Sequence, residues 1–287
     1  MKKYILLTIL VLGLLACEEN DSSNINQDVT IFSSYKIFRD GSNFLENRNL
    51  LADIHLTSYS FFNGRFSQLN EYRGNAEIWG DSLHTISVNA GDVIIGGTGP
   101  LSAIQSEYTP NYWSYSTQEY HGSWNENTPP FDLNFGSNQR WYIEGNSSLG
   151  VSEVDINLYI PKLFEITSGL NGEYGINNSV DRTQDWTITW DAETYNSEGK
   201  VALIFFYDKG NSRSSERPNL PATIDSYQIL VDDTGSYTFP SSFLLNWPKG
   251  AFFQMIMGRG KYDIVEKPEG FYRFSTITMT DARLIMD

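Results

Sequence analysis

The chain has 287 residues, of which 40% are hydrophobic, 14% aromatic and 19% charged, so it has ample core material and is not a disordered chain. Its formal net charge of −15 argues against a nucleic-acid partner, because nucleic-acid affinity depends on Lys and Arg displacing counterions. One cysteine excludes an intrachain disulfide and a multi-cysteine metal cluster, and three histidines exclude a His-rich zinc site. We therefore predict no metal and no other cofactor.

The first residues have the pattern of a secretory signal. Lys2 and Lys3 form a positive region, and residues 4–12 form an apolar segment. That segment is too short for a stable membrane-spanning helix, so residues 1–16 are interpreted as a cleaved signal peptide that ends before Cys17. An ordinary secretory signal with an accidental cysteine is the alternative.

The residues that end in Cys17 resemble the lipobox of bacterial lipoproteins, in which Leu14 and Ala16 match the pattern. The resemblance implies that Cys17 becomes the first mature residue and carries the lipid that anchors the chain to a membrane. Residues 17–28 are polar and acidic, which predicts a flexible tether. This acidic patch also resembles the surface-export signal of Bacteroidota lipoproteins, which implies the outer membrane and favours the cell surface over the periplasmic face.

Beyond the tether, short segments rich in β-branched and aromatic residues alternate with turn residues, which predicts an all-β fold of two β-sandwich-like domains. The first is the N-terminal β domain, residues 29–160, which ends at a boundary near Pro161. Residues 96–140 predict long loops or very short strands. Strands of this domain are expected at residues 29–38, 51–62, 76–79, 84–88, 93–95, 141–144 and 154–160.

The second domain, residues 161–287, has the strand pattern of a Greek-key or immunoglobulin-like sandwich. The apolar run 201–207 predicts a strand covered on both faces. One helical turn is predicted at residues 243–247, capped by Ser241 or Ser242. Strands are expected at residues 163–167, 186–190, 201–207, 226–231, 236–239, 251–257, 262–265 and 272–279, the last extending toward residue 285.

Three segments of this second domain, residues 186–190, 232–240 and 258–262, resemble immunoglobulin-like domains at the ends of uncharacterised Bacteroidota lipoproteins. The resemblance implies an immunoglobulin-like sandwich. It implies no activity, because sandwiches host many unrelated functions.

The stretch from Tyr108 to Trp124 carries the strongest functional hint. Flat aromatic rings stack on sugar rings, and Tyr and Trp also dominate protein interfaces. The alternative is that these rings form a satellite core under long loops. The candidate ligand-binding residues are Tyr112, Trp113, Tyr115, Tyr120 and Trp124.

No catalytic centre is predicted. The Asp-Thr-Gly sequence at residues 233–235 resembles the signature of aspartic proteases, but its single copy and its spacing from residues 255–258 favour a β-turn. Acidic residues near the aromatic stretch leave a glycoside hydrolase open, although their spacing selects no pair. These acidic residues are Glu119, Glu126, Asp132 and Glu144.

Other candidate groups receive structural interpretations. His55 and His84 are expected to be sheet residues, whereas His121 lies within the aromatic stretch and is the histidine of interest. Residues 258–261, with sequence Gly-Arg-Gly-Lys, predict a hairpin turn with two exposed charges.

The sequence therefore predicts a membrane-anchored extracytoplasmic lipoprotein that acts as a non-catalytic binding module. Its expected partner is a glycan or an envelope protein. The alternatives are a carbohydrate-active hydrolase that uses a pair of acidic residues, and a structural accessory subunit of an envelope complex.

Overall fold

The structure is a computed structural model that describes residues 50–62, 67–81, 83–109, 112–117, 120–121, 135–170, 178–193, 200–208 and 226–287. Several predictions fall outside this part of the chain: the lipid acceptor Cys17, the strand at residues 29–38, and Trp124. Three of the four acidic candidates, Glu119, Glu126 and Asp132, lie outside it too.

The fold is all-β, as predicted, and is built on one ten-stranded sheet. The sheet contains, in spatial order, β13 (Ser226–Asp232), β12 (Lys200–Tyr207), β15 (Phe252–Lys267), β16 (Gly270–Met286), β1 (Leu50–Phe62), β2 (Ser67–Ile78), β5 (Trp113–Ser116) and β4 (Ile104–Gln105), with β10 (Asn178–Val180) beside β16 and β6 (Tyr120–His121) beside β2.

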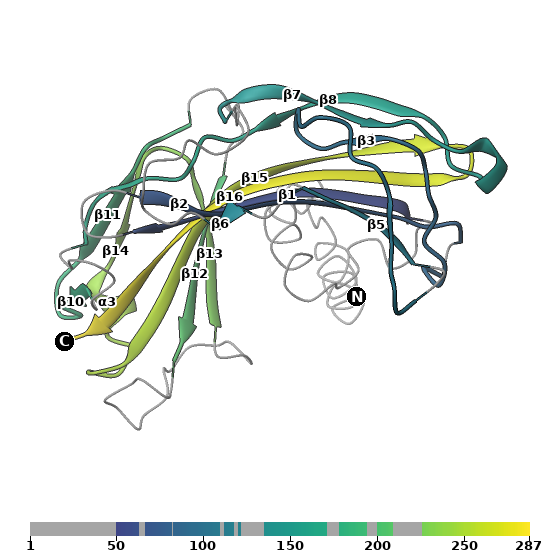
Figure 1. Cartoon of the computed structure of the whole chain (residues 1–287). Coiled ribbons are helices and arrows are strands. Elements are labelled where there is room, and N and C mark those ends of the chain that lie inside the picture. Colours follow the sequence, from purple (N-terminus) through teal and green to yellow (C-terminus); the bar gives the residue numbers. More distant parts are fainter. Residues whose placement is uncertain are drawn as a thin grey trace, which may run out of the picture.

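Two three-stranded sheets pack on this large sheet. They are β14 (Ser236–Phe239), β11 (Trp186–Trp190) and β9 (Ile166–Ser168), and β3 (Val93–Ile94), β7 (Ser137–Ile143) and β8 (Val154–Ile160). The described helical elements are a 3-10 turn, η1 (Ser147–Leu149), and one short helix, α3 (Ser241–Leu244). The large sheet is arched, with β7 and β8 over its convex side (Figure 1).

Each small sheet closes one hydrophobic core against the large sheet, which gives a sandwich-like arrangement at both ends of the molecule. One core draws on β3, β7 and β8 and is completed by Tyr272 and Phe274 from β16. The other core draws on residues from Phe164 onward, including Leu203 and Phe205 of β12. The predicted strand at residues 201–207 lies between β13 and β15 in the large sheet, and its residues 201–205 are buried.

The predicted boundary near Pro161 separates most residues of these two cores, but Tyr272 and Phe274 belong to the first core from beyond it, and the large sheet runs through both cores. β1 pairs in parallel with β16 from Leu50 opposite Phe271 to Phe61 opposite Asp281. Strands from both sides of residue 161 therefore share one hydrogen-bonded sheet.

The predicted hairpin turn at residues 258–261 is wrong, because these residues lie inside the continuous strand β15. Their glycines permit close packing of β15 on β16. A Cβ on Gly260 would lie 2.7 Å from the Thr276 carbonyl oxygen, and one on Gly258 would lie 3.0 Å from Met279 Cγ. Glycine inside a strand here marks a close backbone approach, not a turn.

Two other local predictions are also corrected. Residues 84–88 form no strand, because His84 has a φ of 55° in a bend and only Ser87 bridges to Trp79. The helical turn begins after Pro240, and no serine side chain caps it. Instead, the Ser241 amide donates to Asp185 Oδ1 at 2.7 Å. A carboxylate from another segment therefore accepts the hydrogen bond from the first turn of the helix that the serine side chain was expected to accept.

Candidate functional site

A row of polar side chains lies on the face of the large sheet that points away from the cores. The antiparallel register places Asp53 opposite Glu77 and His55 opposite Asn75. Because side chains alternate across a strand, the intervening residues of β1 point into a core. We call this surface the polar face and define it as Asp53, His55, Asn75, Glu77, Tyr112, Ser114 and Ser116.

An ion pair forms the inner end of the polar face. Arg273 lies beside Asp53 in the β1–β16 register, and its Nε donates to Asp53 Oδ1 at 2.9 Å while its Nη2 donates to Oδ2. The two side chains are 7% and 15% exposed. Two parallel hydrogen bonds fix the carboxylate in one orientation.

Glu77 and Tyr112 form the more accessible end. The Tyr112 hydroxyl donates to Glu77 Oε1 at 2.6 Å, and the Tyr112 side chain is 36% exposed. Burial, together with the hydrogen bond to the Glu77 carboxylate, raises the pKa of Tyr112 to about 12. At neutral pH Tyr112 is therefore a protonated donor with its ring at the surface.

A neutral histidine and an amide lie between these two pairs. Burial lowers the pKa of His55 below 6.5, so its imidazole is uncharged at pH 7. His55 Nε2 lies 3.4 Å from the Asn75 side-chain amide. That amide can be oriented to accept from Arg73 Nε at 2.8 Å and to donate to Ser116 Oγ at 3.0 Å.

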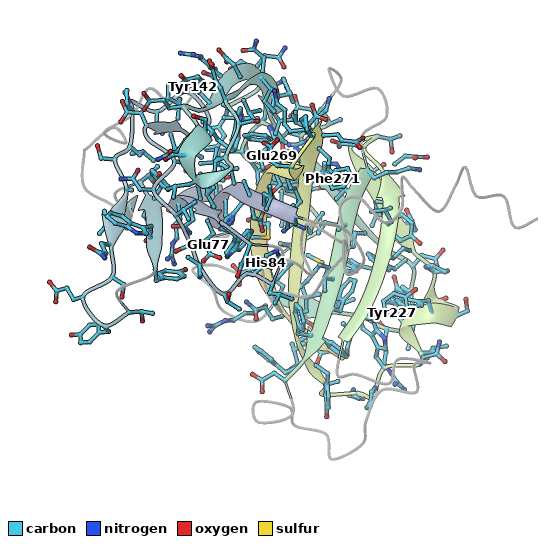
Figure 2. The ribbon with its side chains drawn as sticks, turned by 90° about the vertical axis from the view of Figure 1, so that its right-hand side faces the viewer. Glu77, His84, Tyr142, Tyr227, Glu269 and Phe271 are labelled. Carbon is cyan, nitrogen blue, oxygen red and sulfur yellow. The ribbon has the colours of Figure 1, made fainter. Side chains whose placement is uncertain are left out.

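An aromatic border adjoins the polar face. Trp79 follows Glu77 by two residues, and its ring stacks on His84 with centroids 4.1 Å apart. His84 Nε2 donates to the Leu50 carbonyl at 2.7 Å, which holds the imidazole at the start of β1. Trp79 also packs with Phe271 in a small apolar cluster. Figure 2 shows Glu77 and His84 in the same region of the molecule.

The structure divides the predicted ligand-binding residues. Tyr112 belongs to the polar face, and Trp113 is half-buried with its amide bound to Ser87 Oγ. Tyr115 is fully buried, and its hydroxyl accepts from the Ala90 amide at 2.8 Å, so this ring is part of a core. The side chain of Tyr120 lies outside the described part of the structure, as does that of His121.

Sequence reasoning missed the other members of the polar face. His55 was expected to be a sheet residue, which it is, but its polar neighbours were not connected with it. The available signal was the alternation of polar residues 53, 55, 75 and 77 with residues that are buried.

The predicted acidic residue Glu144 lies elsewhere, in an open hollow of about 610 Å³ that Glu153 and Glu269 also line. Glu269 Oε1 accepts from the Tyr272 hydroxyl at 2.6 Å and from the Ser152 amide at 3.0 Å. Burial opposes ionisation of Glu269, but these hydrogen bonds outweigh it and lower the pKa. The Glu144 carboxylate accepts from the Asp92 amide at 2.8 Å. Both carboxylates thus hold local loop structure.

Arg259 is the centre of a buried ion-pair cluster, not the exposed charge that was predicted. Its side chain is 2% exposed and donates through Nη1 to Asp233 Oδ2 at 3.0 Å and through Nη2 to Asp191 Oδ1 at 3.1 Å. Glu193 is anchored beside it by the Tyr159 hydroxyl at 2.5 Å. The cluster joins β15 to both small sheets and has a structural role.

Two features are absent from the described part of the chain. No group of three or more His, Cys, Asp or Glu side chains there is arranged to hold a metal ion. None of the helices there is both long enough and apolar enough to cross a membrane.

Comparisons with known proteins define no family. No family model matches the chain, and no curated protein matches it. Among solved structures, a chimeric titin Z1Z2 functionalized with a KLER exogenous peptide from decorin aligns over 83% of this chain and 98% of its own. The identity is 8% and the TM-score is 0.17, a similarity too weak to indicate fold or function.

Proposed function

We propose that the chain is a non-catalytic glycan-binding module whose ligand lies on the polar face. The observation that carries this proposal is the Glu77–Tyr112 pair on the accessible part of the polar face, with the exposed His84 imidazole stacked on the buried Trp79 ring at its border. Sugar rings present hydroxyl groups at their edges and apolar patches on their faces. Carboxylate, amide, imidazole and hydroxyl groups can bond the edges, while aromatic rings pack on the faces.

The proposal includes an N-terminal lipid anchor at Cys17 on the outer membrane, facing the cell surface. It is supported by the lipobox-like residues that end at Cys17 and by the acidic segment behind them. Metabolic labelling with an alkyne fatty acid tests it. Label should enter the wild-type chain and be absent from Cys17→Ser, whereas equal labelling of both would exclude this anchor.

A glycan array with the mature chain in detergent tests the binding function. Tyr112→Ala and Glu77→Gln should each weaken binding by about tenfold or more, since each removes a direct contact worth about 1.4 kcal/mol. Tyr142→Ala is the matched control, because Tyr142 lies on β7 and well away from Glu77 (Figure 2). Binding of no glycan would refute the proposal. Co-purification with an envelope protein would then favour an accessory subunit.

One observation favours glycoside hydrolysis as a second candidate function. Asp53 and Glu77 are directly opposed on neighbouring strands, so their side chains lie on the same face of the sheet. Glycosidases hydrolyse their substrates with a pair of carboxyl groups. Hydrolysis requires that Asp53→Asn and Glu77→Gln abolish turnover while glycan binding persists, whereas a binding module shows no turnover in the wild type.

A further inference from the structure

Resting on the proposed glycan-binding function, we infer that the polar face takes an uncharged, linear oligosaccharide of about three sugar units that lies across strands β1, β2, β5 and β4. The register brings polar side chains from three of these strands into rows that run across the sheet, and Ser114 of β5 lies opposite Ile104 on the edge strand β4.

The rows set the direction and length of the ligand. One row contains Asp53 and Glu77, and the other contains His55, Asn75 and Ser116. On β5, Ser114 pairs with Ile104 of the edge strand β4. Neighbouring strands lie about 4.8 Å apart, so four strands span about 14 Å, which matches a trisaccharide more closely than a single sugar.

Exposure increases along this direction. The Arg273 and Asp53 side chains are 7% and 15% exposed at the inner end. Tyr112 is 36% exposed and Ile104 is 61% exposed toward the sheet edge. The ligand therefore makes its closest contacts on β2, β5 and β4, while the Arg273–Asp53 pair supports the inner end.

The charges on this surface favour a neutral ligand. Arg273 is already bound by Asp53 through two hydrogen bonds. Glu77 and Arg73 carry opposite charges on the same strand, and His55 is uncharged at pH 7 because burial lowers its pKa. The surface thus has no excess positive charge, and the chain carries a net charge of −15. Acidic glycans would meet long-range repulsion.

Isothermal titration of the full mature chain tests both the length and the charge of the ligand. The probes are neutral gluco-, manno- and xylo-oligosaccharides from mono- to hexasaccharide, with oligogalacturonides of the same lengths as the charged match. Affinity for one neutral series should rise about tenfold or more from mono- to trisaccharide and then level off. Oligogalacturonides should bind about tenfold more weakly at low salt, and salt should narrow that difference.

A variant on β5 tests whether the oligosaccharide extends across this strand. Ser114→Ala should lower affinity for trisaccharides about threefold, whereas Ser148→Ala in η1 should leave that affinity unchanged. Equal affinity for mono- and trisaccharides, equal or tighter binding of oligogalacturonides, or no effect of Ser114→Ala would overturn this inference while glycan binding stands. Binding of no saccharide at all would overturn the proposed function itself.

Discussion

The Arg259 guanidinium donates to the Asp233 carboxylate at 3.0 Å, although Arg259 lies inside a strand and Asp233 lies in the turn that leads from β13 to β14 in another sheet. Both side chains are 2% exposed. Asp233 also accepts from Trp190 Nε1 at 2.8 Å, and Arg259 lies over the Phe164 ring at 4.8 Å. One buried cation therefore connects the large sheet to the turn between β13 and β14.

Arg259→Leu should destabilise the fold by about 3–5 kcal/mol, because it leaves the Asp233 and Glu193 carboxylates buried without their cation. Lys261→Ala on the same strand is the control, and since Lys261 is exposed its effect should stay within about 0.5 kcal/mol. Urea unfolding followed by tryptophan fluorescence measures both. Equal losses in the two variants would show that the cluster contributes nothing specific.

Asp191 should make stability depend on pH in a defined direction. Burial raises the pKa of Asp191 above 3.8, even though Arg259 attracts its charge. A folded pKa above the unfolded one gives a contribution that is complete below about pH 4 and is lost as pH rises through the folded pKa. The stability of the wild type relative to Asp191→Asn should therefore be greater in acid than at pH 7. Urea titrations across this range measure it, and a difference that grows with pH would mean that Arg259 outweighs burial.

Gly260→Ala tests the contact between β15 and β16. The new methyl group would lie 2.7 Å from the Thr276 carbonyl oxygen, so the two strands must separate, at a cost of about 1–3 kcal/mol. Gly99→Ala is the matched control, because a Cβ there meets nothing within 4 Å. Thermal melts of both variants compare them directly. An unchanged melting temperature for Gly260→Ala would show that the strands tolerate a wider separation.

Glu77→Gln should lower the pKa of Tyr112 from about 12 toward, but not to, its ordinary value near 10, because burial contributes alongside the Glu77 carboxylate. A pH titration of ¹³Cζ-labelled tyrosine by NMR measures this, with Tyr112→Phe identifying the resonance. The Tyr142 resonance on β7 is an internal control and should not move between wild type and Glu77→Gln. An unchanged Tyr112 pKa would mean that the 2.6 Å hydrogen bond does not form in solution.

Local patterns in the sequence predicted much of the fold. β8, β11 and β14 have the predicted bounds, and the Asp-Thr-Gly segment forms the expected turn, in which Gly235 has a φ of 90°. Each of these features depends on neighbouring residues, namely alternation within a strand or a glycine that tolerates positive φ.

Features that depend on distant partners were not predictable in this way. Gly258 and Gly260 appear as turn residues until the approach of β16 is known. Arg259 appears exposed until its carboxylates from other segments are brought to it. The polar face likewise requires the strand register, since its Asp53–Arg273 pair joins residues 220 positions apart.

The order of strands in the large sheet also determines when the molecule can fold. β16 follows β1, β7 and β8 in the chain, yet it supplies Tyr272 and Phe274 to the core that these strands begin. Such non-local pairing is slow, because the entropy of closing a long loop must be overcome before any contact compensates for it. A growing chain that stops before residue 270 therefore leaves that core open, and both halves of the molecule become stable in the same late step.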